Sequence, residues 1–391
     1  MKICLLAPRF PFPQFGGDVL RLNEISKYLK SKGHELILVS LSDVKCPPLD
    51  EASLLYDKIY VQHRNPLTSY IFSLLYLLTG KPMQCGYYHS SSYMKLLKKV
   101  VEVEKPDIYV CHLLRMVPYL EKLGVQSASI VEMTDALSKT YVLSSSAKGV
   151  GLLKYIYSVE QQYIERYEQY VIERFPKVVL VSQTDVEYLR AKAKVPSDSL
   201  AMHTNGVNLM DVIPTNYKSN KICFIGNMRS VQNQDAALFF VNEVFPYVKE
   251  SVPDAKFYIV GSLPPANIQA LASDDIIVTG FVDDLESEIS DSCVAVAPVR
   301  VAAGIQNKVL VAMGCGIPVV LTSLISKAIP ELKDGENCFV RDDAKLIAGS
   351  CVELMKNERL RFQLSTNGYD VVKRFYSWTE KLSNYEVIER P

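Results

Sequence analysis

The chain has 391 residues, which is about two to three times the length of a usual domain, so two domains are expected. It contains 43 basic and 43 acidic residues, and a formal net charge of zero gives no broad attraction to nucleic acid. Hydrophobic residues make up 48% and charged residues 22%, which is typical of a folded globular protein and excludes a disordered one.

The nine cysteines show no CxxC pair and no metal-ligand spacing, so we expect free thiols in a reducing compartment. Met1 leads directly into a strand-like run, and no secretory signal peptide is expected. The longest apolar stretch, Leu67 to Leu78, is shorter than the roughly 20 residues that span a bilayer. We expect a buried helix there, with a membrane-facing or lipid-binding surface as the alternative.

The first half alternates short β-branched runs with stretches of helical period, a pattern typical of a parallel sheet covered by helices. After the first run, Val19, Leu22, Ile25 and Leu29 predict one apolar face of a helix that Gly33 ends. The predicted strands of this half are Lys2–Ala7, Glu35–Ser40, Lys58–Val61, Asp107–Cys111, Ser129–Glu132 and Lys177–Ser182.

The first predicted strand leads into a long loop, APRFPFPQFGGDVLRL, which ends at Gly16 and Gly17 before a helix near Asp18. A dinucleotide fingerprint would need a tight GxGxxG turn, and this loop does not have one. Paired glycines allow backbone amides at a helix N-terminus to approach an anion or sugar hydroxyls. A plain connection in which Asp18 caps the helix explains the same residues equally well.

The alternation restarts after a polar, turn-rich segment, so we expect a domain boundary near residues 200–220. The predicted strands of the second half are Lys221–Ile225, Lys256–Val260, Ile276–Thr279, Cys293–Ala297 and Pro318–Leu321. Its predicted helices are Asn233–Glu250, Glu286–Ser290, Ile305–Met313 and Ala344–Lys356. Ligands of such sheets bind at the carboxyl ends of the strands.

Two loops of the second half have residues suited to a nucleotide. In FIGNMRSVQNQDA, Gly226 follows a strand and Arg229 lies before a helix, where a guanidinium suits a diphosphate. The alternatives are that Arg229 is a solvated loop residue and that Asn233 is a helix cap. In VTGFVDD, the turn through Phe281 and Val282 offers backbone groups to a nucleobase. The two aspartates that follow it fit solvated or capping roles, and we expect no metal.

The strongest motif is APVRVAAGIQNKVLVAMGCGIPVV, which predicts strand, glycine loop, helix and strand in turn. Gly304 allows close backbone approach, and the amides of Ile305 and Gln306 open the helix towards a phosphate. Lys308 lies in the first turn, where a cation opposes the helix dipole. An anionic ligand nearby would account for that cation.

At these motifs the chain resembles the retaining GT-B glycosyltransferases of family four, especially those of capsule, exopolysaccharide and lipopolysaccharide synthesis. The similarity runs through nearly the whole chain, and its specificity lies in the order and spacing of individually weak motifs. The matching pieces are FGGDVLRL, GKPMQCGYY at Gly80, YVCHLLRMVPYL around His112, MTDALSKTY around Asp135, ERYEQYVIERFPKVVLVSQTDVEYL, TNGV at Asn205, GNMRSVQNQDA, PDAKFYIVG, VTGFVDD and GIQNKVLVAMGCGIPVV.

The resemblance implies an α/β fold of the GT-B type, with two Rossmann-like domains facing across a cleft. Residues 1–205 would form the acceptor domain, together with a C-terminal helix over 372–391 that crosses back to it. Residues 206–371 would form the domain that binds the nucleotide-sugar donor. The segment RFYSWTEKLSNYEVI, with the single tryptophan Trp378, resembles the crossing helix.

The resemblance also implies roles for individual residues. Arg229 and Lys308 would neutralise the donor diphosphate and His112 would lie near the transferred sugar, so these three are the predicted catalytic residues. The predicted donor-binding residues are Gly16, Gly17, Gly226, Phe281, Val282, Gly304, Ile305, Gln306 and Asn307. The predicted acceptor-binding residues are Asp18, Arg21 and Asp135. No metal or cofactor is expected, because cations and backbone dipoles stabilise the leaving nucleotide.

Two of these residues have simpler explanations when considered alone. A histidine after an apolar strand is more often a satisfied core residue, and only the resemblance favours a functional His112. Asp135 fits a turn or a helix cap nearly as well as an acceptor contact.

The resemblance predicts sugar transfer from a UDP- or GDP-sugar to a surface polysaccharide or lipid-linked glycan, with retention of configuration. The expected location is the cytoplasm, with peripheral contact at the inner membrane as a further expectation. The family usually has two glutamates in the strongest motif, and here Ala303 and Val311 replace them. Without the second, Gln306 or Asn307 must hold the ribose. A catalytically silent binding protein and a GT-B sugar-nucleotide epimerase are the alternatives.

Overall fold

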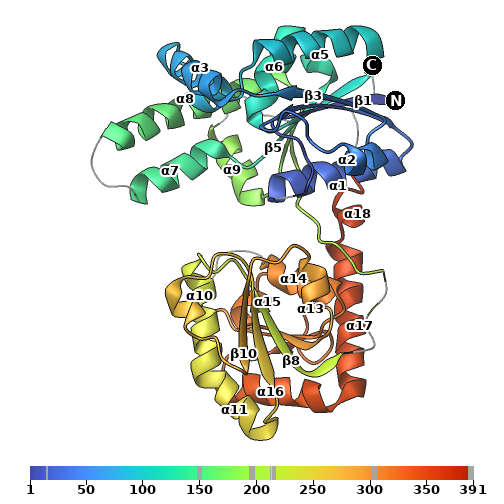
Figure 1. Cartoon of the computed structure of the whole chain (residues 1–391), viewed down its shortest axis with the longest axis vertical. Coiled ribbons are helices and arrows are strands. Elements are labelled where there is room, and N and C mark those ends of the chain that lie inside the picture. Colours follow the sequence, from blue (N-terminus) through green and yellow to red (C-terminus); the bar gives the residue numbers. More distant parts are fainter. Residues whose placement is uncertain are drawn as a thin grey trace. The chain divides into compact units, whose positions relative to one another are not determined.

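The computed structural model describes residues 1–14, 16–147, 152–192, 199–211, 213, 217–300 and 306–385. They form two compact units (Figure 1). The first comprises Met1–Asn205 and the described residues from Leu382 onwards, and the second is Gly206–Lys381. Each unit is a parallel sheet with helices on both faces, which confirms the predicted α/β class with two Rossmann-like domains.

The first unit has a seven-stranded parallel sheet in its described part, in the order β3-β2-β1-β4-β5-β6-β7. Its strands are β1 (Lys2–Ala7), β2 (Glu35–Ser42), β3 (Lys58–His63), β4 (Ile108–His112), β5 (Ser129–Thr134), β6 (Lys177–Leu180) and β7 (Leu200–Met202). The strand order reverses between β1 and β4, which pair in register from Ile3 opposite Ile108. Ligands of open α/β sheets bind at such a switch point.

The helices of the first unit are α1 (Gly17–Ser31), α2 (Asp50–Leu55), α3 (Pro66–Leu78), α4 (Met83–Tyr87), α5 (Ser91–Glu104), α6 (Val117–Leu123), α7 (Leu137–Ala147), α8 (Leu152–Arg174) and α9 (Gln183–Lys192). Short turns lie at η1 (Leu114–Met116) and η2 (Gln126–Ala128). The central strands β1 and β4 are buried along nearly their whole length, as expected for unbroken apolar runs between two helical layers.

The second unit has six parallel strands in its described part, in the order β10-β9-β8-β11-β12-β13. They are β8 (Lys218–Ile225), β9 (Lys256–Val260), β10 (Ile276–Gly280), β11 (Ser292–Ala297), β12 (Val319–Leu321) and β13 (Phe339–Val340). The helical elements are α10 (Val231–Phe239), η3 (Phe240–Val244), α11 (Phe245–Ser251), α12 (Ala266–Gln269), α13 (Leu285–Ile289), α14 (Asn307–Gly314), α15 (Ser323–Ser326), α16 (Ala344–Lys356), α17 (Glu358–Phe375) and α18 (Trp378–Lys381). The switch point of this sheet lies between β8 and β11.

The C-terminal segment differs from the predicted helix over 372–391. Residues up to Phe375 continue α17, α18 follows after a break, and Lys381 still belongs to the second unit. Tyr376 has a φ of −131°, which ends the helix, and Ser377 pairs with Val207 in an isolated parallel bridge. The segment therefore returns to the first unit about ten residues later than predicted, at Leu382.

The stretch predicted to be a buried helix, Leu67 to Leu78, is helical but not buried. Within α3 only Ser69 and Ser73 are buried, and most of its large apolar side chains are exposed. Across the described residues, no helix has both the length and the apolar character needed to cross a membrane.

Candidate functional site

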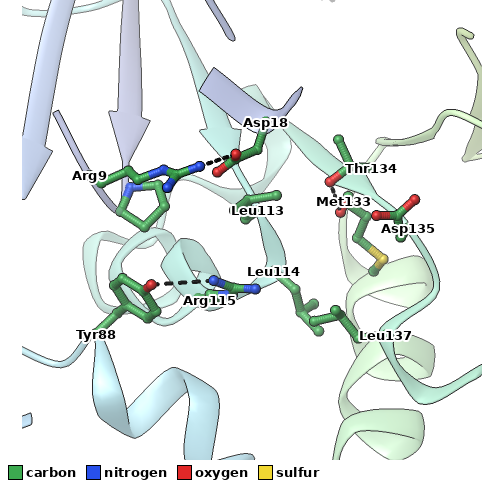
Figure 2. Close-up of a pocket in the computed structure, with 11 residues that line it drawn as sticks. Arg9, Asp18, Tyr88, Leu113, Leu114, Arg115, Met133, Thr134, Asp135 and Leu137 are labelled. Carbon is green, nitrogen blue, oxygen red and sulfur yellow. Dashed lines mark hydrogen bonds and ion pairs between the residues drawn. The ribbon is translucent and has the colours of Figure 1, made fainter. Parts of the chain in front are cut away.

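A cavity of about 390 Å³ lies at the carboxyl ends of β1, β4 and β5, next to the switch point of the first sheet (Figure 2). The loops that follow these strands and the start of α1 supply its walls. Its lining residues are Pro8, Arg9, Asp18, Tyr88, Leu113, Leu114, Arg115, Met133, Thr134, Asp135 and Leu137.

Charged groups of both signs surround this cavity. Arg9 forms an ion pair with Asp18 on one side. On the opposite wall, Arg115 Nη1 donates to the Tyr88 hydroxyl at 3.3 Å, and the guanidinium lies 5.3 Å from the centre of that ring. The Nε of Arg115 is buried and has no partner among the described residues. The Arg115 guanidinium, the Tyr88 hydroxyl and the carboxylates of Asp18 and Asp135 thus line one cavity, which suits a polyhydroxylated ligand.

The backbone at the mouth of the cavity adopts conformations that L-residues rarely take. Leu113, after β4, has a φ of 71°, and Thr134, at the end of β5, has a φ of 65°. The surrounding hydrogen bonds hold both residues: Leu113 N donates to Glu132 O at 2.8 Å, and Val181 N donates to Thr134 O at 2.9 Å. Such backbone strain concentrates at binding and catalytic sites.

Asp135 is exposed at the rim of the cavity. Its pKa is raised above the usual value, first by desolvation and then by the neighbouring carboxylate of Asp185. It does not cap α7 by any hydrogen bond from its side chain among the described contacts, whereas Glu168 accepts from the amide and hydroxyl of Ser138 in that helix.

Arg21 does not reach the cavity. Its Nε donates to Glu132 Oε2 at 2.8 Å and its Nη1 to Asn205 Oδ1 at 3.0 Å, and the side chains of Arg21 and Glu132 have no exposed surface. A fully buried side chain cannot contact an acceptor, so the prediction that Arg21 binds the acceptor is wrong. Its contacts hold α1 against β5 and against the end of the first unit.

His112 ends β4 directly opposite Glu132 on β5. It is 2% exposed, and neither ring nitrogen has a hydrogen-bond partner in the described part of the chain. Burial lowers its pKa to about 4, against the opposing effect of the Glu132 and Asp18 carboxylates. The imidazole is therefore neutral at pH 7, with one donor and one acceptor unused. The expectation of a satisfied core histidine does not hold.

The two glycines at the start of α1, Gly16 and Gly17, differ in whether another residue could replace them. Gly16 precedes the helix with a φ of 95°, and a Cβ there would lie 3.0 Å from Arg9 Nη2. Gly17 opens the helix, and a Cβ there would meet nothing within 4 Å among the described atoms. Gly16 is thus required by the backbone, while Gly17 leaves open space at a helix N-terminus.

In the second unit, Lys308 lies in the first turn of α14 and hydrogen-bonds to Asn233 Oδ1. Its ammonium group is 4.9 Å from the centre of the Phe224 ring, and burial lowers its pKa to about 8. None of the ion pairs in the described part of the chain includes Lys308. This cation is half-buried, opposes the dipole of α14 and has no compensating carboxylate.

Asn233 connects Lys308 to the loop after β8. Its amide donates to Asn227 O at 2.8 Å, and a Cβ on Gly226 would lie 2.8 Å from that amide nitrogen. Arg229 lies in the same loop with an exposed side chain, and its backbone N donates to Asn227 Oδ1 at 3.0 Å. Asn233 is not the cap that its alternative predicted, because the N-cap position of α10 is Ser230. Its side-chain amide instead donates to the loop and accepts from the lysine.

The remaining predicted donor residues surround the same edge of the second sheet. Gln306 precedes α14 and is buried, and Asn307 opens the helix and is exposed. Phe281, after β10, is 62% exposed, while Val282 packs against the core. Gly304 and Ile305 lie outside the described residues. Asp284 caps α13 by accepting from Ser287 N at 2.9 Å, as its capping alternative predicts.

Residues 219–357, which form most of the second unit, match the family described as Glycosyl transferases group 1. The second unit is therefore similar to that glycosyltransferase family. The whole chain also matches, over its length, a Klebsiella pneumoniae protein described as an uncharacterized 44.6 kDa protein in the cps region. The two are 23% identical over 390 residues, which cover 96% of each chain.

Solved structures show the same fold. Sucrose-phosphate synthase from Thermosynechococcus elongatus aligns with a TM-score of 0.62 at 16% identity, covering 98% of this chain and 97% of that chain. S. aureus TarM, solved with UDP and α-GlcNAc-glycerol, aligns with a TM-score of 0.60 at 12% identity, covering 98% and 99%. Anabaena HepE in complex with UDP aligns at 0.57 and 12% identity, covering 98% of each. These alignments confirm the predicted GT-B fold.

The structure brings the predicted residues together in two groups. Asp18 and Asp135 line the cavity of the first unit, and Lys308, Gly226 and Arg229 surround the switch point of the second. Their roles remain predictions. The sequence analysis missed the polar cavity residues Arg9, Tyr88 and Arg115, although Tyr88 and Arg115 lie in motifs that support the resemblance. The sequence could have indicated Arg9 and Arg115 as site residues, because each follows shortly after a buried strand.

Proposed function

We propose that this chain transfers a hexose or related sugar from a UDP- or GDP-sugar to a surface polysaccharide or lipid-linked glycan, with retention of configuration. The observation that supports it most is the half-buried, uncompensated Lys308 at the start of α14. A cation in that position is unfavourable unless an anion binds, and a nucleotide diphosphate supplies two phosphates at a helix N-terminus.

In this proposal, Lys308, Arg229 and the first amides of α14 stabilise the charge that develops on the leaving nucleotide diphosphate, so no metal is required. Ribose recognition belongs to Gln306 or Asn307, because Val311 has no polar group to offer. HepE and TarM have both been solved in complex with UDP, which favours UDP over GDP here.

The cavity of the first unit is the proposed acceptor site. The Arg115 guanidinium and the carboxylates of Asp18 and Asp135, which line it, suit the hydroxyls of a glycan. The neutral His112, with both ring nitrogens unpartnered, is proposed to serve the transferred sugar. The proposal places the protein in the cytoplasm, in peripheral contact with the membrane that bears lipid-linked acceptors.

The test is release of nucleotide diphosphate from a panel of UDP- and GDP-sugars, with and without a membrane glycolipid extract and with EDTA in a parallel series. We expect one UDP-sugar to give acceptor-dependent UDP release that EDTA does not abolish, and an α-linked product from an α-linked donor. Absence of both binding and turnover with every donor would contradict the proposal. Conversion of the donor without acceptor would instead identify an epimerase.

A catalytically silent binding protein is the second candidate, because Val311 stands where the family usually has a glutamate. Calorimetry distinguishes it: glycan binding without binding of any nucleotide would favour the silent protein, whereas micromolar binding of UDP would favour the transferase.

A further inference from the structure

Helix α3 presents its apolar side chains outwards and its small polar side chains inwards. Ser73 Oγ donates to Met83 O at 3.1 Å, and Ser69 Oγ donates to Asn65 O at 3.2 Å. The opposite face is an apolar stripe in which every member is between 47% and 75% exposed. This stripe consists of Leu67, Tyr70, Ile71, Leu74, Leu75 and Leu78.

Packing against α4 fixes the orientation of α3, with its apolar side chains outwards. A Cβ on Gly86 of α4 would lie 2.4 Å from Phe72 O, so the two helices approach as closely as backbones allow. Met83 N donates to Glu160 Oε2 of α8 at 2.8 Å, which fixes α4 in turn. Arg64, just before α3, stacks 4.4 Å from the centre of the Tyr87 ring. The stripe therefore remains on the surface.

Cations gather at the C-terminal end of α3. A cavity of about 190 Å³ there is lined by Lys81, Lys122 and Arg166, with tyrosines from α3 and α8 around them. All three side chains are exposed, and none is in an ion pair within the described part of the chain. The pKa of Lys122 is lowered by burial and by the charge of Lys81, and Glu121, the acidic residue of the cavity, accepts instead from Tyr167 at 3.1 Å.

The sequence around α3 also has more basic than acidic residues. Residues 58–101, which include α3, α4 and most of α5, contain no aspartate or glutamate in a chain whose net charge is zero. The six basic residues of this segment are Lys58, Arg64, Lys81, Lys95, Lys98 and Lys99. Of these, Lys58 pairs with Glu104 and Arg64 with Asp43, and no ion pair in the described part of the chain includes the other four. An exposed apolar stripe beside exposed cations and tyrosines matches the composition of helices that lie in the interface of an anionic bilayer.

We propose that α3 and the Lys81–Lys122–Arg166 cavity dock the protein on an anionic lipid bilayer. The stripe enters the boundary between headgroups and acyl chains, and the three cations bind a headgroup phosphate. At about 1.5 Å per residue, α3 is too short to span a hydrocarbon core of about 30 Å, so it lies in the plane of the interface. A symmetric pair of copies joined through this face would instead bring like charges together.

This inference deepens the proposed function, on which it rests for its biological purpose, but its test needs neither donor nor acceptor. The full chain is centrifuged with vesicles of phosphatidylcholine alone and with vesicles containing phosphatidylglycerol. We expect binding to the anionic vesicles that weakens as salt is raised.

Two variants separate the two parts of the surface. The stripe variant, Leu67→Gln, Ile71→Gln, Leu74→Gln and Leu78→Gln, is expected to lose binding on the order of a hundredfold. The cation variant, Lys81→Gln, Lys122→Gln and Arg166→Gln, is expected to lose the preference for anionic vesicles by a similar factor, since each basic residue adds to attraction at the surface. The control is Leu54→Gln, which removes an exposed leucine from α2 and should bind as the wild type does.

Failure of the wild type to bind either vesicle, or unchanged binding by the stripe variant, would overturn the proposal. A dimer in the absence of lipid that the stripe substitutions dissociate would assign the face to a second copy and would also overturn it. Unchanged melting temperatures of both variants verify that the fold is intact. UDP binding is measured separately, so a wild-type chain that binds UDP but neither vesicle contradicts this inference alone.

Discussion

At the residue scale, Lys308 shows how the fold holds a charge in readiness for a ligand. Its ammonium group is desolvated against Phe224 and has a single neutral partner, Asn233. Burial favours the uncharged amine and lowers the pKa to about 8. A bound diphosphate would restore the charged form, so donor affinity and the protonation of this lysine are linked.

The first prediction follows from this linkage. The protonated form binds the diphosphate, and it is lost as pH rises through about 8. We expect the affinity for UDP to fall about tenfold between pH 7 and pH 9, measured by calorimetry. Lys308→Met should bind UDP more weakly at pH 7 and show no such fall. A pH-independent affinity of the wild type would contradict the role of Lys308.

The second prediction concerns Val311, which lies half-buried one turn after Lys308 on α14. A carboxylate at this position would accept from the ribose hydroxyls, and a hydrogen bond to a charged group contributes about 1.5–3 kcal/mol. Val311→Glu is therefore expected to strengthen UDP binding by about ten- to a hundredfold. Val311→Gln serves as the uncharged control. Unchanged affinity in Val311→Glu would show that the nucleotide binds elsewhere.

The third prediction concerns the buried pair of Arg21 and Glu132. Removing one partner leaves an uncompensated buried charge, so Arg21→Met should lower the free energy of unfolding by about 3–5 kcal/mol. The double variant Arg21→Met, Glu132→Leu should recover most of that loss. Chemical denaturation checks both values. A double variant as unstable as the single one would show that Arg21 acts through its other contact, Asn205.

At the element scale, strand ends and helix starts determine both sites. The strands with unbroken apolar runs were predictable, whereas β7 and β13 were missed because three and two residues leave no periodicity to detect.

The orientation of α3 was wrongly predicted. Two serines and Gly86, which lies outside the helix, determine which face of α3 packs inwards. The cavity of the first unit joins Arg9, Tyr88 and Arg115 from three distant loops, and no local pattern reveals that they meet.

The fourth prediction tests the approach of β9 to the loop after β8. A Cβ on Gly261 would lie 1.8 Å from Gly226 O, and its φ of 150° disfavours any L-residue. Gly261→Ala should therefore destabilise the second unit by about 2–4 kcal/mol and disturb UDP binding.

The matched control lies in α16, where a Cβ on Gly349 meets nothing within 4 Å among the described atoms. Gly349→Ala should stabilise the unit by about 0.5–1 kcal/mol, because alanine is the better helix former. Thermal unfolding distinguishes the two directions. Equal effects of both substitutions would mean that the close approach at Gly261 is not maintained.

At the scale of the whole molecule, the chain passes between the two units twice, after Asn205 and again after Lys381. Within the second unit the two passages are held together, since a Cβ on Gly206 would lie 2.4 Å from Trp378 N. Beyond the second passage, Tyr385 is buried in the first unit with its ring centre 5.3 Å from that of His203. The sequence predicted two units and a returning segment from the resemblance, but not the residue at which the chain returns.

The fifth prediction removes this returning segment. A chain that stops at Lys381 loses Leu382 and Tyr385 from the core of the first unit, at a cost of about 3–5 kcal/mol for a buried aromatic side chain. Calorimetry should show an earlier transition for the first unit and an unchanged one for the second. Tyr385→Ala alone should reproduce much of the shift. A single transition that moves as a whole would contradict the independence of the units.

The burial of Tyr385 has a consequence for synthesis on the ribosome. Domains usually fold in the order in which they emerge from the exit tunnel. Here the earliest-made domain lacks part of its interior until translation has passed residue 385, by which time all of Gly206–Lys381 has been made. The donor-side domain is thus the first that can complete its structure, and the N-terminal one waits, with exposed apolar surface, as a natural client for chaperones.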